Sequence, residues 1–174
     1  SAQTLARATQ GERILLAAGT RGLGTGGDPS LGAAAATAST RSLRGALAGG
    51  DLVFVVAGLA GGTGGGAGPE VARQARAAGA VTVGFGVLPF GFETQRRREA
   101  AATARHALRG ACDTVVLLDN ARAARLAGAV PLDVALRIAD DVLRQAVQGV
   151  TELLAGRGII DVDLAHVRAV LTDA

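Results

Sequence analysis

Residues 51–70 read DLVFVVAGLAGGTGGGAGPE, and this stretch decides the fold. Residues 51–59 form a continuous apolar run rich in valine, which is typical of a strand buried on both faces of a parallel sheet. The glycines that follow predict a loop, and residues 69–79 predict a helix. A strand that passes through a glycine-rich loop into a helix is the first part of a βαβ unit.

The same alternation continues on both sides of this stretch. The predicted strands are residues 12–19, 51–59, 80–89 and 113–120, and the predicted helices are residues 30–49, 69–79, 96–111 and 135–156. The order predicts an α/β fold of the three-layer, Rossmann-like kind, with a mostly parallel sheet and helices on both faces. Ligands of such sheets bind beyond the carboxyl ends of the strands, where the glycine-rich loops fall, so we expect a nucleotide site.

Composition narrows the class of protein further. A chain of 174 residues with 49% apolar and 19% charged side chains fits one folded domain rather than a disordered segment. We find no membrane-length apolar run and no secretory signal in the sequence, so a cytoplasmic location is expected. All 18 basic residues are arginines scattered among alanines, which does not indicate a nucleic-acid partner. The single Cys112 lies in an apolar context and is predicted to be buried.

The loop AGGTGGG, residues 60–66, is the first candidate for binding chemistry. Glycines without Cβ let backbone N–H groups approach a phosphate, and the positive end of the next helix favours its charge. The loop is neither a GxGxxG dinucleotide fingerprint nor a phosphate loop ending in Gly-Lys-Ser/Thr, because the chain contains no lysine. A tight turn without a ligand is the alternative interpretation.

This loop resembles the signature GGGTGTG of FtsZ, the tubulin-like GTPase of bacterial cell division. Four further motifs are similar to the same family: TRGLGTGGDPSLG at 20–32, LPFGFETQRRR at 88–98, ADDVLRQAVQGV at 139–150 and GIIDVDLAHVRAVL at 158–171. The resemblance implies that residues 1–174 are part of an FtsZ-like GTPase domain that ends in the synergy loop and the start of the central helix. The family's first strands, first phosphate loop and C-terminal domain are not recognisable, so we expect an unpaired strand edge.

The resemblance assigns the phosphate and ribose contacts residue by residue. The residues expected to cradle the phosphates are Gly61, Gly62, Thr63, Gly64 and Gly66, and those expected to face the terminal phosphate are Gly24, Thr25 and Gly26. Glu93 and Arg97 would hold the ribose, a carboxylate accepting from its hydroxyls and a guanidinium donating to oxygens. Taken without the resemblance, this pair is equally an exposed i, i+4 salt bridge.

The resemblance also assigns the base contacts. Asn120 and Asp140 would read the base edge. A carboxylate suits the N–H donors of guanine, which adenine lacks, so GTP and GDP are expected rather than ATP. Leu136 stands where the family often stacks a phenylalanine on the base. We expect Mg²⁺ to be held through phosphates and water, with no protein metal site.

Hydrolysis in the family uses a head-to-tail filament in which the synergy loop of one protomer enters the nucleotide site of the next. The matching residues are Asp161, Asp163 and His166, where the family typically has Asn, Asp and Asp. A neutral imidazole at His166 orients water but supplies no negative charge, so GTP hydrolysis is expected to be weak or lost. A solvated helix residue is an equal interpretation of His166.

Two function hypotheses follow. The first is a GTP-binding, self-assembling GTPase that acts in the cytoplasm at the division site, with itself as partner. The second is a non-catalytic FtsZ-like module that regulates or copolymerises with full-length FtsZ and other division proteins. Direct membrane contact is not expected, because the family makes it through a C-terminal tail. A dinucleotide-dependent oxidoreductase is disfavoured by the missing GxGxxG unit.

Overall fold

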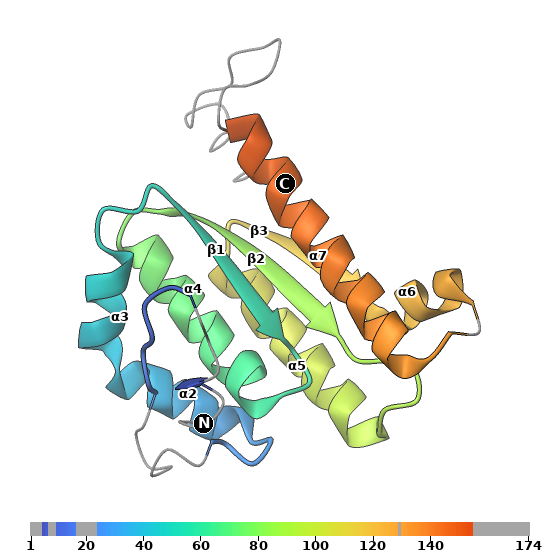
Figure 1. Cartoon of the computed structure of the whole chain (residues 1–174). Helices are drawn as coiled ribbons and strands as arrows, with labels where there is room; N and C mark the ends of the chain where they lie inside the picture. Colours follow the sequence, from blue (N-terminus) through green and yellow to red (C-terminus); the bar gives the residue numbers. More distant parts are fainter. Residues whose placement is uncertain (1–4, 7–9, 17–23, 129, 155–174) are drawn as a thin grey trace.

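The computed structural model describes residues 5–6, 10–16, 24–128 and 130–154 (Figure 1). Its centre is a parallel sheet in the order β1-β2-β3, made of Leu52–Gly58, Val81–Leu88 and Thr114–Asp119. Three of the predicted strands are therefore confirmed, each within one or two residues of its predicted ends. The register pairs Gly58 with Val87 and Leu88 with Asp119, so all three strands end at one edge of the sheet.

Helices cover both faces of the sheet, as predicted. Figure 1 shows α4 (Gly68–Ala77) and α5 (Gln95–Ala111) on one face, and α7 (Leu132–Leu154) crossing the other. The short helix α6 (Asn120–Ala127) packs against α7. The helices α2 (Pro29–Ala38) and α3 (Thr40–Leu47) pack against α4. The architecture is the expected three-layer α/β arrangement.

The core lies between the sheet and the pair α4 and α5. Leu59 and Leu108 are fully buried there. Strand β2 has no room for a side chain at two positions on this side, because a Cβ at Gly84 would come 2.8 Å from the sulfur of Cys112 and one at Gly86 would come 2.8 Å from Leu59. Cys112 is buried as predicted, and burial raises the pKa of its thiol to about 11. The glycines of β2 thus let α5 lie close against the sheet.

Polar contacts close the amino end of the sheet. The N–H of Thr82 donates to Oδ2 of Asp113 at 2.8 Å, and the N–H of Asp113 donates to the carbonyl of Thr82 at 2.9 Å. The other oxygen of Asp113 pairs with Nε of Arg76 at 3.0 Å. One carboxylate therefore joins β2, β3 and the last turn of α4.

The N-terminal strand prediction is wrong for the residues that can be checked. Residues 12–16 of the predicted strand 12–19 are not in a strand, and residues 17–19 lie outside the described residues. Ile14 and Leu16 instead pack against the apolar cluster of Ala36, Leu43 and Ala67. These two alternating side chains are partly buried against helices, which satisfies the same pattern without strand pairing.

The helix prediction 30–49 corresponds to two helices rather than one. The chain breaks between α2 and α3 at Ser39, where the hydroxyl of Thr40 donates to the carbonyl of Thr37 and the hydroxyl of Thr37 to that of Ala33. Hydroxyl groups that bond to nearby backbone compete with a continuous helix. Helix α6 was not predicted at all, and α7 begins three residues before its predicted start at 135. Among the described residues, no helix combines the length and apolarity needed to cross a membrane.

Candidate functional site

The candidate site lies at the carboxyl edge of the sheet. Beyond β1 the chain passes through residues 59–62 into a π-helical turn, η1 (Thr63–Ala67), which continues into α4. Beyond β2 it passes through residues 89–94 into α5, and β3 runs directly into α6. Because the strands are parallel, these three connections meet at one edge.

The glycine-rich loop has two sides. Gly62, Gly65 and Gly66 are buried, whereas Gly61, Thr63 and Gly64 are partly or fully exposed. The backbone N–H groups of Gly62, Thr63 and Gly64 find no acceptor among the residues that the structure describes. Free N–H groups at the start of a helix, with the positive end of its dipole, are a suitable environment for a phosphate. The geometry therefore fits the group that the sequence predicts here.

Residues 24–28 lie directly on this loop. A Cβ at Gly62 would meet the backbone N and O of Asp28 at 2.6 and 2.7 Å, and would also collide with Oγ1 of Thr25. Gly24 and Gly26 have positive φ angles of 94° and 58°, which glycine adopts without strain. The structure thus brings together the two segments that were predicted to hold phosphates.

Sequence reasoning missed Asp28, which fixes this arrangement. One carboxylate oxygen accepts from the amide N–H of Ser30 at 2.8 Å and from its hydroxyl at 2.7 Å, which caps α2. These two bonds, with smaller contributions from the amide of Leu31 and the charge of Arg96, lower the pKa of Asp28 below its ordinary value. The signal was present, since Asp followed by Pro and Ser is typical of a helix start.

Glu93 and Arg97 are brought together, and they also hold their own loop. Oε2 of Glu93 pairs with Nε of Arg97, while Oε1 accepts from the N–H of Phe90 at 2.8 Å. Arg98 donates to the carbonyls of Gly91 and Glu93. The i, i+4 ion pair is therefore present, and the Glu93 side chain is only 18% exposed. The ribose role stays a prediction.

The predicted base contacts lie on neighbouring helices. Asn120 begins α6 immediately beyond β3, and Asp140 is an exposed residue of α7, which packs against α6. Leu136, where the family often has a phenylalanine, is 44% exposed on the same helix. Asp119, which was not predicted, caps α6 by accepting from the N–H groups of Ala121 and Arg122 at 2.9 and 3.2 Å.

An aromatic pair borders the site. Phe92 is 71% exposed and stacks on the buried Phe90 with ring centres 5.2 Å apart. Beside them lies a small apolar cavity of about 180 Å³ between the loop and the helices α6 and α7. Its lining residues are Phe90, Phe92, Ala124, Gly128, Val130, Leu132 and Ala135.

The predicted catalytic residues cannot be placed. Asp161, Asp163 and His166 all lie outside the described residues. Within the described ranges, no group of three His, Cys, Asp or Glu side chains could form a cage for a metal ion.

The fold and the loops at the carboxyl edge define the class: an α/β domain built like the nucleotide-binding proteins. A family model described as the GTPase domain of the Tubulin/FtsZ family matches residues 1–128. The chain therefore belongs to the Tubulin/FtsZ family.

The relatives found by sequence are cell-division proteins. The chain is 43% identical over 173 residues to "Cell division protein FtsZ 1" of Pyrococcus horikoshii, covering 99% of this chain and 46% of that protein. It is 42% identical to the protein of the same description from Thermococcus kodakarensis, with the same coverage of 99% and 46%. The chain spans about half the length of the curated relatives it matches.

Solved structures agree with this membership. An FtsZ dimer from M. jannaschii superposes with a TM-score of 0.93 at 38% identity, covering 99% of this chain and 50% of that one. A GTPγS-bound protofilament of CetZ2 from Haloferax volcanii superposes with a TM-score of 0.80 at 26% identity, covering 92% and 49%.

Proposed function

We propose that this chain is part of a GTP-binding, self-assembling cell-division protein of the FtsZ type. The observation that carries the proposal is the contact of residues 24–28 with the start of η1, where three N–H groups have no acceptor among the described residues. The glycine-rich loop and the helix dipole supply positive potential without any lysine. GTPγS is bound in the related CetZ2 protofilament, which supports the same ligand class here.

The other predicted residues complete the proposed site. Thr25 with Gly24 and Gly26 faces the terminal phosphate, and Glu93 with Arg97 contacts the ribose. Glu93 and Arg97 form an ion pair at the same edge of the sheet. Hydrogen bonds to the sugar hydroxyls would replace this ion pair when a nucleotide binds. Mg²⁺ would be held through the phosphates and water, since that ion keeps most of its hydration shell.

Guanine selection is the sharpest test of this proposal. Asp140 and Asp141 are adjacent carboxylates on α7, but Asp141 accepts from Arg144 and Gln145, at 2.8 and 2.6 Å. We expect labelled GTP bound to the chain in Mg²⁺ to be displaced by GDP and not by ATP. The variant Asp140→Asn should reduce the preference for GTP over ATP about tenfold or more, because a site that pairs with substrate donors rejects the analogue that lacks them.

The neighbouring variant Asp141→Asn is the matched control and should leave the preference unchanged. A folded chain that binds no nucleotide would contradict the proposed function. Equal effects of the two variants would remove Asp140 from the base contacts and leave the rest of the proposal in place.

Assembly and hydrolysis belong to the same proposal. The related structures are described as a dimer and a protofilament, which supports a second copy of the protein as the partner. Hydrolysis would occur between protomers, with Asp163 orienting water in the neighbouring site, assisted by Asp161. Sedimentation of the protein with and without GTP tests the assembly, and pellets that do not depend on GTP would count against it.

A non-catalytic module that copolymerises with FtsZ is the second candidate. The imidazole of His166, in place of the family's usual carboxylate, favours it. Co-sedimentation with FtsZ polymers, combined with absent turnover, would support this candidate, and the absence of co-sedimentation would reject it.

A further inference from the structure

Helix α2 lies backbone to backbone on the turn η1. Gly32 is buried in the interior of α2, and a Cβ there would collide with the carbonyl of Gly62 and come 3.3 Å from the N of Ala67. From the other side, a Cβ at Gly66 would collide with the carbonyl of Pro29 and come 2.8 Å from the N of Ala33. Glycines on both elements thus permit one close contact.

This contact explains a residue that helix propensity disfavours. A glycine inside a helix costs about 1 kcal/mol relative to alanine. Gly45 in α3 is also helical, but it is exposed and a Cβ there would meet nothing within 4 Å. Gly32 therefore has a packing reason that Gly45 lacks, and the two positions form a matched pair.

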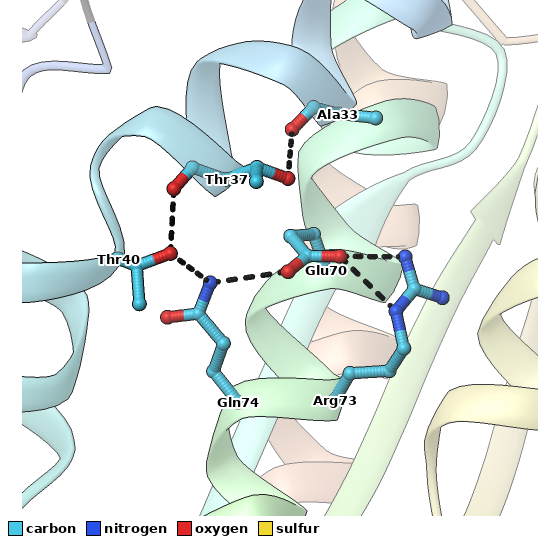
Figure 2. A network of polar contacts seen from close by, with 6 residues as sticks. All are labelled: Ala33, Thr37, Thr40, Glu70, Arg73 and Gln74. Atoms are coloured by element: carbon cyan, nitrogen blue, oxygen red, sulfur yellow. Dashed lines mark hydrogen bonds and ion pairs between the residues drawn. The ribbon is translucent and has the colours of Figure 1, made fainter.

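The C-terminal end of α2 is also held in place, through its junction with α3 (Figure 2). Nε2 of Gln74 in α4 donates to Oγ1 of Thr40 and to Oε1 of Glu70, both at 3.2 Å, and Oε2 of Glu70 pairs with Arg73 at 2.8 Å. Burial alone would raise the pKa of Glu70, but the bonds from Arg73 and Gln74 outweigh it and lower the pKa. The carboxylate therefore stays charged, and Gln74, only 6% exposed, ties the junction of α2 and α3 to α4.

Both ends of α2 are thus held against the continuous segment η1–α4, which begins at the glycine-rich loop. Asp28, at the start of α2, is in contact range of Gly62, so a shift of α2 on η1 moves residues 24–28 relative to the exposed N–H groups. We propose that Gly32 is a positioning residue that sets residues 24–28 on the glycine-rich loop, and thereby sets how strongly the site prefers a nucleoside triphosphate to a diphosphate. This inference rests on the proposed function.

The experiment compares Gly32→Ala with Gly45→Ala in the whole chain, measuring the dissociation constants of labelled GTPγS and GDP. The added methyl at Gly32 displaces α2, so contacts to the terminal phosphate weaken while those to the first two phosphates persist. We expect the GTPγS preference over GDP to fall about tenfold, the loss of roughly one hydrogen bond to a charged phosphate. Gly45→Ala should leave the preference unchanged.

A purely structural role would lower both affinities by one common factor, through the loss of folded protein, and that result would overturn the proposal. If Gly32→Ala does not fold, Thr40→Val decides. It leaves the contact at Gly32 intact and removes the two bonds of the Thr40 hydroxyl at the far end of α2, from Gln74 and to the carbonyl of Thr37. A fall in the preference supports the proposal, and an unchanged preference rejects it. Binding of neither nucleotide by the unmodified chain would instead mark the failure of the proposed function.

Hydrogen exchange without nucleotide tests the contact independently of binding. Gly32→Ala should raise amide exchange in the two segments together, at Asp28 within residues 24–28 and at Gly65 within residues 61–66, since both N–H groups have backbone acceptors. Gly45→Ala should change neither segment. Faster exchange in only one of the two segments would show that they are not held by a common contact, and would overturn the proposal.

Discussion

The amino and carboxyl ends of the parallel sheet differ in whether their polar groups have hydrogen-bond partners within the fold. At the amino end, the carboxylate of Asp113 is 10% exposed and serves Thr82 and Arg76, while the carbonyl of Asp51 accepts from Val81 at 2.9 Å. At the carboxyl end, Gly62, Thr63 and Gly64 present N–H groups that have no acceptor within the described part of the chain. These polar groups at the amino end have hydrogen-bond partners within the fold, whereas the carboxyl end presents backbone donors without one in the residues that the structure describes.

This difference separates stability from binding in space. A closed polar network stabilises the fold and has no capacity for a ligand, whereas open donors cost stability until a ligand accepts from them. Substitutions at the amino end should therefore act on folding alone, and those at the carboxyl end on ligand affinity. The following predictions test that division, beginning with the largest expected effect.

Asp113→Ala should lower the free energy of unfolding by about 2–3 kcal/mol, because it leaves the fully buried N–H of Thr82 without its acceptor. Urea unfolding measures this loss. Nucleotide affinity per folded molecule should not change. The control is Asp133→Ala, whose pair with Arg137 spans 3.5 Å between exposed side chains and should contribute at most about 0.5 kcal/mol. Similar losses of stability in both variants would contradict a special stabilising role for the network at the amino end.

Gly61→Ala should lower nucleotide affinity and leave the free energy of unfolding nearly unchanged. The nearest atom to its new methyl is the carbonyl oxygen of Gly58 at an ordinary 3.6 Å, so the fold accommodates it. The methyl projects into the exposed side of the loop, and we expect GTP affinity to fall about tenfold, the loss of one hydrogen bond to a charged group. Isothermal calorimetry measures the affinity. Gly110→Ala, with nothing within 4 Å, is the control, and equal affinities would remove Gly61 from the site.

The smallest effect concerns acid pH at the cap of α2. The folded pKa of Asp28 lies below its ordinary value of 3.8, so its stabilising contribution is present above that value and is lost as the pH falls through the folded pKa. The amide of Ser30 should then lose exchange protection first in this region. The Asp28→Asn variant keeps an acceptor without titrating, and its Ser30 protection should be less dependent on acid pH. Identical profiles would show that the cap does not depend on charge.

The sheet was predictable because its residues carry one unambiguous pattern. Residues 52–58 and 81–88 are continuous apolar runs between glycine-rich turns, and they form strands at nearly the predicted positions. Residues 12–16 have a similar apolar character, but Ile14 and Leu16 are used against helices. The sequence indicates that such residues are buried, and only the tertiary structure decides what covers them.

The site was predictable in its loops and not in its internal contacts. The glycines of the loop at 61–66 were attributed to the approach of a phosphate or, alternatively, to a tight turn, and not to packing against another segment. Gly62 and Gly66 also lack side chains because Asp28 and Pro29, from another part of the chain, occupy that space. Helix α6 could have been found from Asp119 as its cap and Gly128, with φ of 77°, at its end. No local pattern reveals a contact between segments distant in the sequence.

The burial of Cys112 makes the chain convenient for spectroscopic labelling. It holds one cysteine and neither tryptophan nor tyrosine. The thiolate is the form that reacts with maleimides, and with a pKa of about 11 the thiol of Cys112 stays protonated and shielded under α5 at neutral pH. A fluorophore attached through Phe92→Cys would therefore label the rim of the candidate site alone. Its signal would not overlap with tryptophan or tyrosine emission, because the chain contains neither residue.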